Sequence, residues 1–212
     1  MMVQLGDRTA QGFEPMIGMH CIATLLFTEL LLPNLRASAE ANGRCGKTRV
    51  VWTSSPAAER FSPHNGIVFD LLNTGSKDRF QNYGASKAGT WLLSREFAHR
   101  YGQDGILSIT QNPGQLKAGS YAGMPWLMMV FLKLLILYDP IFGAYTELYA
   151  GLSDDIEMGD NGAYVIPWGR IRRDEDIPRK DLVEALLIKE EGGLGYGERF
   201  WEWCEGQWKA LV

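Results

Sequence analysis

Residues 82–89 read NYGASKAG and open a run of helix-forming residues that continues to about Tyr101. Tyr83 and Lys87 are four positions apart, so on a helix they project from the same face, one turn from each other. A nearby ammonium stabilises a phenolate and lowers the pKa of the tyrosine, which suits the phenol to proton transfer near neutral pH. Solvated helix faces also produce this spacing by accident, so the pair indicates a proton-transfer site only together with its flanking segments.

Two apolar segments flank this helix, and each ends in residues suited to a ligand site. Residues 49–55, RVVWTSS, are largely apolar and β-branched and end in Ser54 and Ser55. Residues 105–114, GILSITQNPG, form a second such run that closes on Pro113 and Gly114. Both patterns are typical of buried strands. Open α/β sheets bind their ligands beyond the carboxyl ends of the strands, where these polar and loop residues would stand.

This order of strand with serine, helix with tyrosine and lysine, and strand with Pro-Gly resembles the catalytic half of the short-chain dehydrogenase/reductases. The wide spacing from serine to tyrosine is most similar to the retinol-dehydrogenase-like members common in fungi. The resemblance runs from about Gly12 to the C-terminus. It implies an α/β fold, the C-terminal half of a Rossmann-like doubly wound parallel sheet. We therefore expect one partial domain over residues 1–212, with about three strands, near Val51, Ile109 and Val165.

The resemblance also implies roles for the central residues. Tyr83 would be the general acid in carbonyl reduction and the base in alcohol oxidation. Lys87 would bind the nicotinamide ribose hydroxyls and lower the pKa of Tyr83. Ser55 would bind the substrate oxygen; Ser54 is the weaker alternative, because neighbouring strand residues face opposite ways. A buried structural tyrosine and an exposed helix lysine are the non-catalytic interpretations of the pair.

Among five further positions of the family's site, three match the family's pattern and two depart from it. His20 stands where relatives have an asparagine that supports a water relay to the lysine; a histidine can hold a water or carry a proton, and a core histidine without a role is an equal alternative. Pro113, Gly114 and Leu116 match the loop whose backbone contacts the nicotinamide carboxamide. Ala118 replaces the hydroxyl usually found two residues after Leu116, which should weaken the binding of NAD or NADP.

The Gly-rich strand–turn–helix that seats a cofactor pyrophosphate in this family is not recognisable. The only Gly-dense stretch, residues 192–197, follows Glu190 and Glu191 near the C-terminus and has no strand before it, so it indicates a helix-breaking turn. No ribose-selecting residue is recognisable either, which leaves NAD and NADP both open. By resemblance the chain lacks the first four strands, and its serine strand would expose an apolar edge. Either the gene model is truncated, or the chain is a degenerate remnant, or something else covers this edge.

The remaining hydrophobic pattern predicts further helices and a lid. Residues 56–81 would form a flap on the substrate side. Residues 123–152 would supply apolar substrate-lid helices, in which Trp126–Leu137 reads as a lid, a core helix or, less favoured, an interfacial membrane helix. The other predicted helices are Gly12 to Pro33, trailing at most to Arg36, then Asp139 to Leu152, Asp176 to Lys189, and Glu198 to Val212.

Composition sets the remaining limits. A chain of 212 residues with 46% hydrophobic residues can build one sizeable core. The net charge of −4 offers no basic face for nucleic acid. The three cysteines are odd in number and lack metal-ligand spacing with the histidines, so we expect no metal site and a reducing, cytoplasmic compartment. The first fifteen residues lack the apolar core of a signal peptide.

Two functions from different classes follow. The first is an NAD(P)-dependent oxidoreductase that interconverts a secondary alcohol and a ketone or aldehyde on a lipophilic small molecule of retinoid, polyketide or terpenoid type, as in secondary metabolism. The second is a catalytically inactive truncated relative that acts as a binding or scaffold protein through its exposed sheet edge. A homodimer through the helices at Gly12–Arg36 and Phe80–Tyr101, as in many relatives, and peripheral membrane contact are left open.

Overall fold

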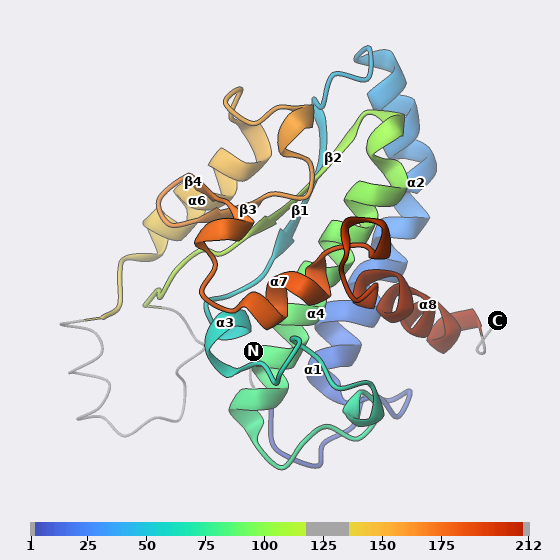
Figure 1. Ribbon diagram of the computed structural model, residues 1–212, viewed down its shortest axis with the longest axis vertical. Coiled ribbons are helices and arrows are strands. Elements are labelled where there is room, and N and C mark those ends of the chain that lie inside the picture. Colours follow the sequence, from blue (N-terminus) through green and yellow to red (C-terminus); the bar gives the residue numbers. More distant parts are fainter. Residues whose placement is uncertain (1–2, 118–135, 210–212) are drawn as a thin grey trace.

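The centre of the sheet is β2, Ile106–Gln111, whose six residues are all buried. β1, Thr48–Thr53, and β3, Tyr164–Ile166, pair with it in parallel on either side, and β4, Arg170–Arg172, runs antiparallel beside β3. The computed structural model describes residues 3–117 and 136–209, and within them the strand order is β1-β2-β3-β4 (Figure 1). The predicted α/β fold with a mainly parallel sheet is confirmed.

The expectation of about three strands was short by one. β4 was missed because its sequence, RIR, is brief and charged and lies at the edge of the sheet, so it carries no hydrophobic run. β1 is the opposite edge strand: in the part of the chain that the structure describes, no strand pairs with its outer side.

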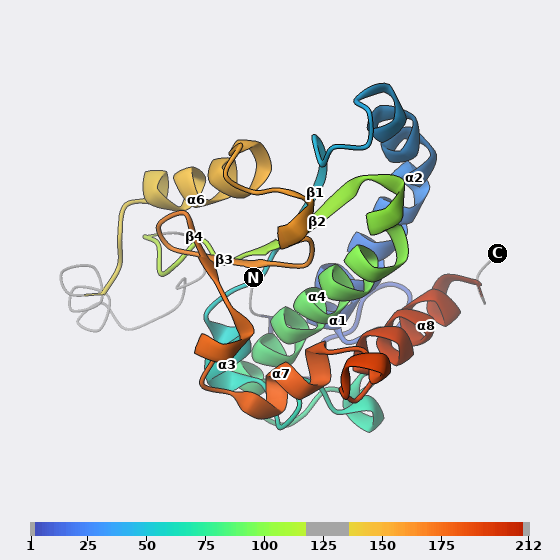
Figure 2. The same cartoon turned by 45° about the horizontal axis from the view of Figure 1, so that its top comes forward.

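Helices cover both faces of the sheet (Figures 1 and 2). On one face, Ile106 packs in the larger core with residues of α2, Ala23–Ala41, α4, Arg79–Tyr101, and α8, Tyr196–Lys209. On the other, Leu107 and Ile109 pack against α6, Pro140–Leu152. This division follows the alternation of side chains along β2. Cys21 and Cys204 are buried free thiols.

α4 is the central helix and matches its predicted range to within one residue. Its N-cap is Asp78, whose carboxylate accepts from the backbone N–H groups of Phe80 and Gln81 and so satisfies two of the free donors of the first turn. Its buried face runs from Asn82 to Phe97 and contacts β1, β2, α8 and α3, Ala57–Phe61.

The N-terminal helix runs much further than predicted. α1, Pro15–Ile17, a π-helical segment, Gly18–Ile22, and α2 are continuous as far as Ala41, so the expected end near Pro33 was wrong. An interior proline costs about 3 kcal/mol, but Pro33 faces solvent, where water can satisfy the carbonyl that loses its donor. Leu32, Leu35 and Ala39 pack on the core and hold the helix on both sides of it.

By length and composition this run, Pro15–Ala41, could also cross a membrane, with a mean hydropathy of 1.6. Core helices of soluble proteins pass the same test, and 39% of the apolar window is buried inside this protein. The run therefore gives only weak support for membrane attachment.

The C-terminal helices also differ in part from expectation. The predicted helix from Asp176 to Lys189 is reduced to α7, Lys180–Leu186, because 3-10 turns occupy Asp174–Asp176 and Lys189–Glu191 on either side. α6 agrees with its predicted range, and α8 begins two residues before the predicted start. Residues 123–135 of the proposed lid, including Trp126, lie outside the described residues.

The predicted flap, residues 56–81, contains α3 and a 3-10 turn at Phe69–Leu71. Ile67 is buried in the larger core, and the Phe69 ring meets Tyr196 edge-on with centroids 5.1 Å apart. This segment is thus anchored at its middle to the start of α8.

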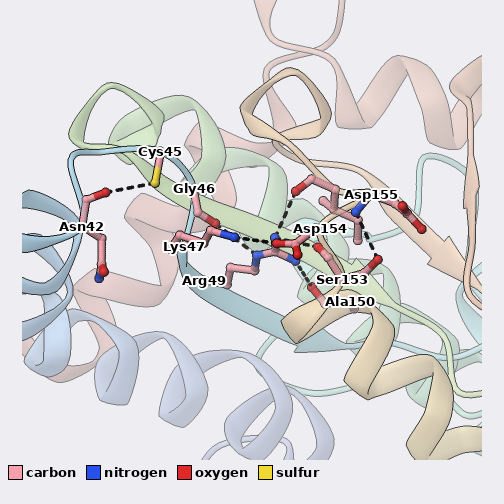
Figure 3. A network of polar contacts seen from close by, with 10 residues as sticks. Asn42, Cys45, Gly46, Lys47, Arg49, Ala150, Ser153, Asp154 and Asp155 are labelled. Atoms are coloured by element: carbon pink, nitrogen blue, oxygen red, sulfur yellow. Dashed lines mark hydrogen bonds and ion pairs between the residues drawn. The ribbon is translucent and has the colours of Figure 1, made fainter.

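Arg49 fastens the start of β1 to the end of α6 (Figure 3). Its guanidinium donates at 3.2, 2.8 and 3.0 Å to three carbonyl oxygens that surround the C-terminus of this helix, those of Ala150, Ser153 and Ile156. Beside it, the exposed Lys47 ammonium pairs with the Asp154 carboxylate at 2.5 Å. The positive charge of Arg49 also interacts favourably with the negative end of the helix dipole.

Candidate functional site

The two serines after β1 have different surroundings. The Ser54 hydroxyl is buried and donates to the backbone carbonyl of Lys87 at 2.9 Å, which ties the strand to α4. Ser55 is partly exposed, and its hydroxyl accepts from the Ala57 backbone N–H at 3.2 Å. Its side chain also lies close enough to the Tyr83 phenol to act on the pKa of that group. Ser55 is therefore the serine that is free to meet a ligand beside the phenol.

Tyr83 lies in the second turn of α4 and is partly buried. Burial raises its pKa above the usual value, and the neighbouring Ser55 hydroxyl opposes this rise without cancelling it. The predicted lowering by Lys87 was wrong for this arrangement. The Lys87 ammonium lies 5.9 Å from the centroid of the phenol ring, too far to outweigh the burial.

Lys87 is buried, with only 8% of its surface exposed, so the interpretation as an exposed helix lysine was wrong. Its Nζ donates to the backbone carbonyl of Thr53 at 3.0 Å, at the end of β1. Burial lowers its pKa, and the neighbouring Cys21 thiol acts in the opposite direction. An ammonium has three donors, and Thr53 is its one acceptor within residues 3–117 and 136–209.

His20 lies in the π-helical segment and faces the same cluster. Its Nδ1 is 2.9 Å from the Ser86 hydroxyl, which donates its one hydrogen to the Tyr83 carbonyl at 2.8 Å. Ser86 must therefore accept from Nδ1–H, which leaves Nε2 as the acceptor nitrogen. Burial, and then the charge of Lys87, lower the pKa of His20 to about 3, so the ring is neutral. The ring meets Tyr83 edge-on at 5.9 Å.

The loop after β2 reaches the same end of the sheet. Because β1 and β2 are parallel and in register, Ser55 and Pro113 both follow the carboxyl ends of their strands, at the same end of the sheet. Gly114 has a φ of +87°, and a Cβ there would come within 2.9 Å of the Pro167 side chain, so only glycine fits. The backbone of Leu116 forms an isolated parallel β-bridge with Tyr138, which fixes the path of the loop away from the sheet.

The glycines at residues 192–197 form the predicted turn. Gly192 ends a 3-10 turn with a φ of +82°, and α8 begins at Tyr196. A Cβ at Gly193 would overlap the backbone of Leu187, so packing explains this glycine.

Three further residues of the cluster were missed from the sequence. Thr53 contributes a backbone carbonyl, which no side-chain motif reveals. Ser86 links His20 to Tyr83 and stands inside the motif itself. Gln111 is a polar residue at the end of an apolar strand, a detectable signal; its Nε2 donates to the Thr53 hydroxyl at 3.1 Å, and its Oε1 is buried without a partner among the described atoms.

His20, Ser55, Tyr83 and Lys87 thus come together, with Pro113 and Gly114 at the same end of the sheet. Across the described ranges no group of three His, Cys, Asp or Glu side chains could hold a metal ion. The cluster offers two hydroxyl donors side by side, a buried ammonium with unused donors, and a neutral imidazole. These groups can bind an oxygen atom and pass it a proton.

No family model matches the chain. Over 208 residues it is 42% identical to a protein of Pestalotiopsis fici named short-chain dehydrogenase/reductase iacJ, covering 98% of this chain and 61% of that protein. A Phomopsis amygdali protein named short-chain dehydrogenase/reductase is 41% identical over 210 residues, covering 97% and 61%. The chain thus spans about 61% of the length of these two relatives.

Solved structures share the fold. A chicken fatty liver carbonyl reductase with bound NADPH superposes with a TM-score of 0.54 at 16% identity, over 81% of this chain and 61% of that one. An uncharacterised protein from Mycobacterium paratuberculosis gives 0.57 at 22% identity, over 95% and 64%. These likenesses show that the sheet and its helices are Rossmann-like.

Proposed function

We propose that this chain is the catalytic part of a short-chain dehydrogenase/reductase that interconverts a secondary alcohol and a ketone or aldehyde. The observation that carries the proposal is the cluster of Ser55, Tyr83 and Lys87 at the carboxyl ends of β1 and β2, in a chain about 40% identical to proteins named for that family. A nicotinamide cofactor would supply or accept the hydride.

Tyr83 and Ser55 would handle the reacting oxygen. Two adjacent hydroxyls can both donate to a carbonyl oxygen, and the charge that develops there is stabilised by both. The raised pKa keeps Tyr83 protonated at neutral pH, which suits it to act as the general acid in reduction. In the oxidation direction the same residue must first lose its proton, so that direction requires a higher pH.

Lys87 and His20 would support this proton transfer. The Lys87 ammonium has two N–H donors beyond the one on Thr53, and vicinal ribose hydroxyls are suitable acceptors for them. The Nε2 of His20 is an acceptor that can hold a water molecule between the cluster and solvent, the role that relatives give to an asparagine. We infer that His20 is a positioning residue for this water.

The residues present fit one end of the cofactor. Lys87, Tyr83 and the Pro113-Gly114 backbone suit the nicotinamide and its ribose, whereas the described segments contain no Gly-rich strand–turn–helix for the pyrophosphate. The residues that select NAD or NADP in this fold follow a strand of the N-terminal half, and this proposal therefore covers both. The retinol-dehydrogenase-like subtype is part of the proposal.

We also propose a substrate type, an oligomeric state and a cellular location, each supported by one feature of the chain. A lipophilic substrate, as in secondary metabolism, agrees with the apolar sequence of Trp126–Leu137. A homodimer agrees with the exposed apolar side chains of Phe27 and Leu30, 63% and 70% exposed on α2. A cytoplasmic location agrees with three free cysteines, and peripheral membrane contact with the apolarity of Pro15–Ala41.

A binding or scaffold protein is the second candidate function. It is favoured by the outer edge of β1, which has no partner strand in the described ranges and offers backbone N–H and C=O groups to another chain.

Titration of the 212-residue chain with NADH and NADPH, followed by cofactor fluorescence, tests the proposal. We expect saturable binding that Lys87→Met weakens at least tenfold. We expect reduction of aromatic ketones that Tyr83→Phe abolishes, while it weakens cofactor binding less than Lys87→Met does. Failure of a folded, monodisperse chain to bind either cofactor would refute the enzymatic function for this polypeptide and favour the scaffold.

A further inference from the structure

A cleft of about 530 Å³ opens beside the proposed reaction centre. It lies between α3, the loop after β2, and the turn that joins β3 to β4. Pro56, the residue after Ser55, forms part of its wall, so the cleft begins one residue from the proposed reaction centre. The remaining walls carry guanidinium groups and aromatic rings, above all those of Arg60, Arg170, Tyr138 and Trp168.

The charges lining this cleft do not balance. Four charged residues line it, Glu59, Arg60, Arg170 and Arg172. Arg172 donates to both carboxylate oxygens of Glu59 at 3.0 Å, and both side chains are mostly buried, so this pair is neutral overall. Two positive charges remain.

Arg60 and Arg170 are held by neutral acceptors alone. The Gln115 amide oxygen accepts from the Arg60 guanidinium, and Nε of Arg170 donates to the Pro167 carbonyl at 3.0 Å. Neither forms an ion pair with any residue that the structure describes. Residues 118–135 contain no Asp or Glu, so that segment has no acidic side chain to offer them.

Aromatic side chains form the apolar part of the wall. The rings of Tyr138 and Trp168 meet edge-on with centroids 4.9 Å apart, and Phe142 supports Trp168 from behind at 5.2 Å. Tyr138 and Trp168 are 52% and 41% exposed, so their surfaces are available to a flat ligand. Rings in this arrangement favour an aromatic or other planar apolar framework.

We propose that this cleft selects substrates in which an aromatic or apolar framework bears a carboxylate, with Arg60 and Arg170 as the residues that bind the acid. Guanidinium groups match carboxylates in geometry and give charge-assisted hydrogen bonds. The proposal rests on the proposed function, because Ser55 and Tyr83 would hold the carbonyl while the arginines hold the acid. It refines the expected lipophilic substrate into a lipophilic acid.

Binding of two matched ketones to the 212-residue chain tests this assignment. The probes are 6-acetyl-2-naphthoate and its uncharged carboxamide, measured by isothermal titration calorimetry at pH 7 and low salt. We expect the acid to bind about tenfold more tightly than the amide, a preference that high salt reduces. Arg60→Gln and Arg170→Gln should each reduce the preference, and the double variant should abolish it.

Arg173→Gln is the matched control. Arg173 is next to Arg172 in sequence, but its side chain is 60% exposed, pairs with Asp160 and does not line the cleft, so the preference should persist. Circular dichroism establishes that each variant is folded. Equal affinity for acid and amide, absence of binding by both, or a preference that survives in the folded double variant would each overturn the proposal.

The same experiment separates this inference from the proposed function. Tyr83→Phe should abolish reduction of the naphthyl ketone while retaining the preference for the acid. A wild-type chain that prefers the acid but never reduces it would support the cleft and contradict the enzyme. A chain that reduces both ketones with equal affinity would support the enzyme and contradict the cleft.

Discussion

Replacement of Arg49 by methionine should destabilise the fold far more than loss of an ordinary surface charge. Methionine keeps much of the apolar stem but removes donors to three carbonyls at the end of α6. A hydrogen bond to a charged group contributes about 1.5–3 kcal/mol, and Arg49 is only partly buried, so water replaces some of the loss. We expect the free energy of unfolding to fall by about 3 kcal/mol, the equivalent of one to two such bonds.

Urea denaturation followed by circular dichroism measures this change, and thermal melting should show a fall of about 6–12 °C at about 2–4 °C per kcal/mol. Lys47→Met is the matched control within the same network (Figure 3). The Lys47 and Asp154 side chains are 57% and 84% exposed, so solvent screens this pair and it should contribute little to stability. If the two variants unfold at the same urea concentration, Arg49 does not hold β1 to α6 in the way described.

Three further predictions concern the site. The pKa of His20 is lowered to about 3, so its contribution to stability is complete above its unfolded pKa of about 6.5 and declines as the pH falls toward 3. Between pH 7.5 and 5, the wild-type protein should therefore lose about 2 kcal/mol more unfolding free energy than the His20→Asn variant. Equal losses in the two proteins would contradict a buried neutral ring. Gly114→Ala should lower stability by about 1–2 kcal/mol more than Gly43→Ala, because both have a positive φ but only the former meets Pro167; equal melting temperatures would contradict this packing. Lys87→Met should raise the unfolding free energy by about 1 kcal/mol while weakening cofactor binding at least tenfold, and a marked loss of stability would contradict a costly buried ammonium.

The parts of the fold that were predictable carry strong local signals. β1 and β2 are apolar, β-branched runs, and α4 begins at an aspartate that caps it, so their ranges follow from the residues themselves. The long N-terminal helix was not predictable, because packing of Leu32, Leu35 and Ala39 overrides the local effect of Pro33. β4 depends entirely on its pairing with β3.

The membership of the site was more predictable than its electrostatics. Strand alternation predicts that only one of Ser54 and Ser55 can face the site, and the family resemblance selects Ser55. In the structure the Ser54 hydroxyl donates to the Lys87 carbonyl. The hydrogen bond from Lys87 to the Thr53 carbonyl could not be predicted, because backbone acceptors leave no trace in a motif. The tautomer of His20 likewise depends on Ser86, whose one proton is directed to a backbone oxygen.

The pKa of Tyr83 explains why a spacing argument gave the wrong sign. Four residues on a helix place a phenol and an ammonium on one face, but the pKa depends on how far apart the charges are and on how much water each loses. Here the ammonium is directed to a carbonyl, and burial of the phenol is the larger effect. A protonated Tyr83 is ready to donate, so the rate of ketone reduction should be flat through neutral pH. Alcohol oxidation should accelerate as the pH rises toward the raised pKa, and an oxidation rate already at its plateau at pH 7 would show that a bound cofactor restores the lowering that the Tyr-x-x-x-Lys spacing predicts.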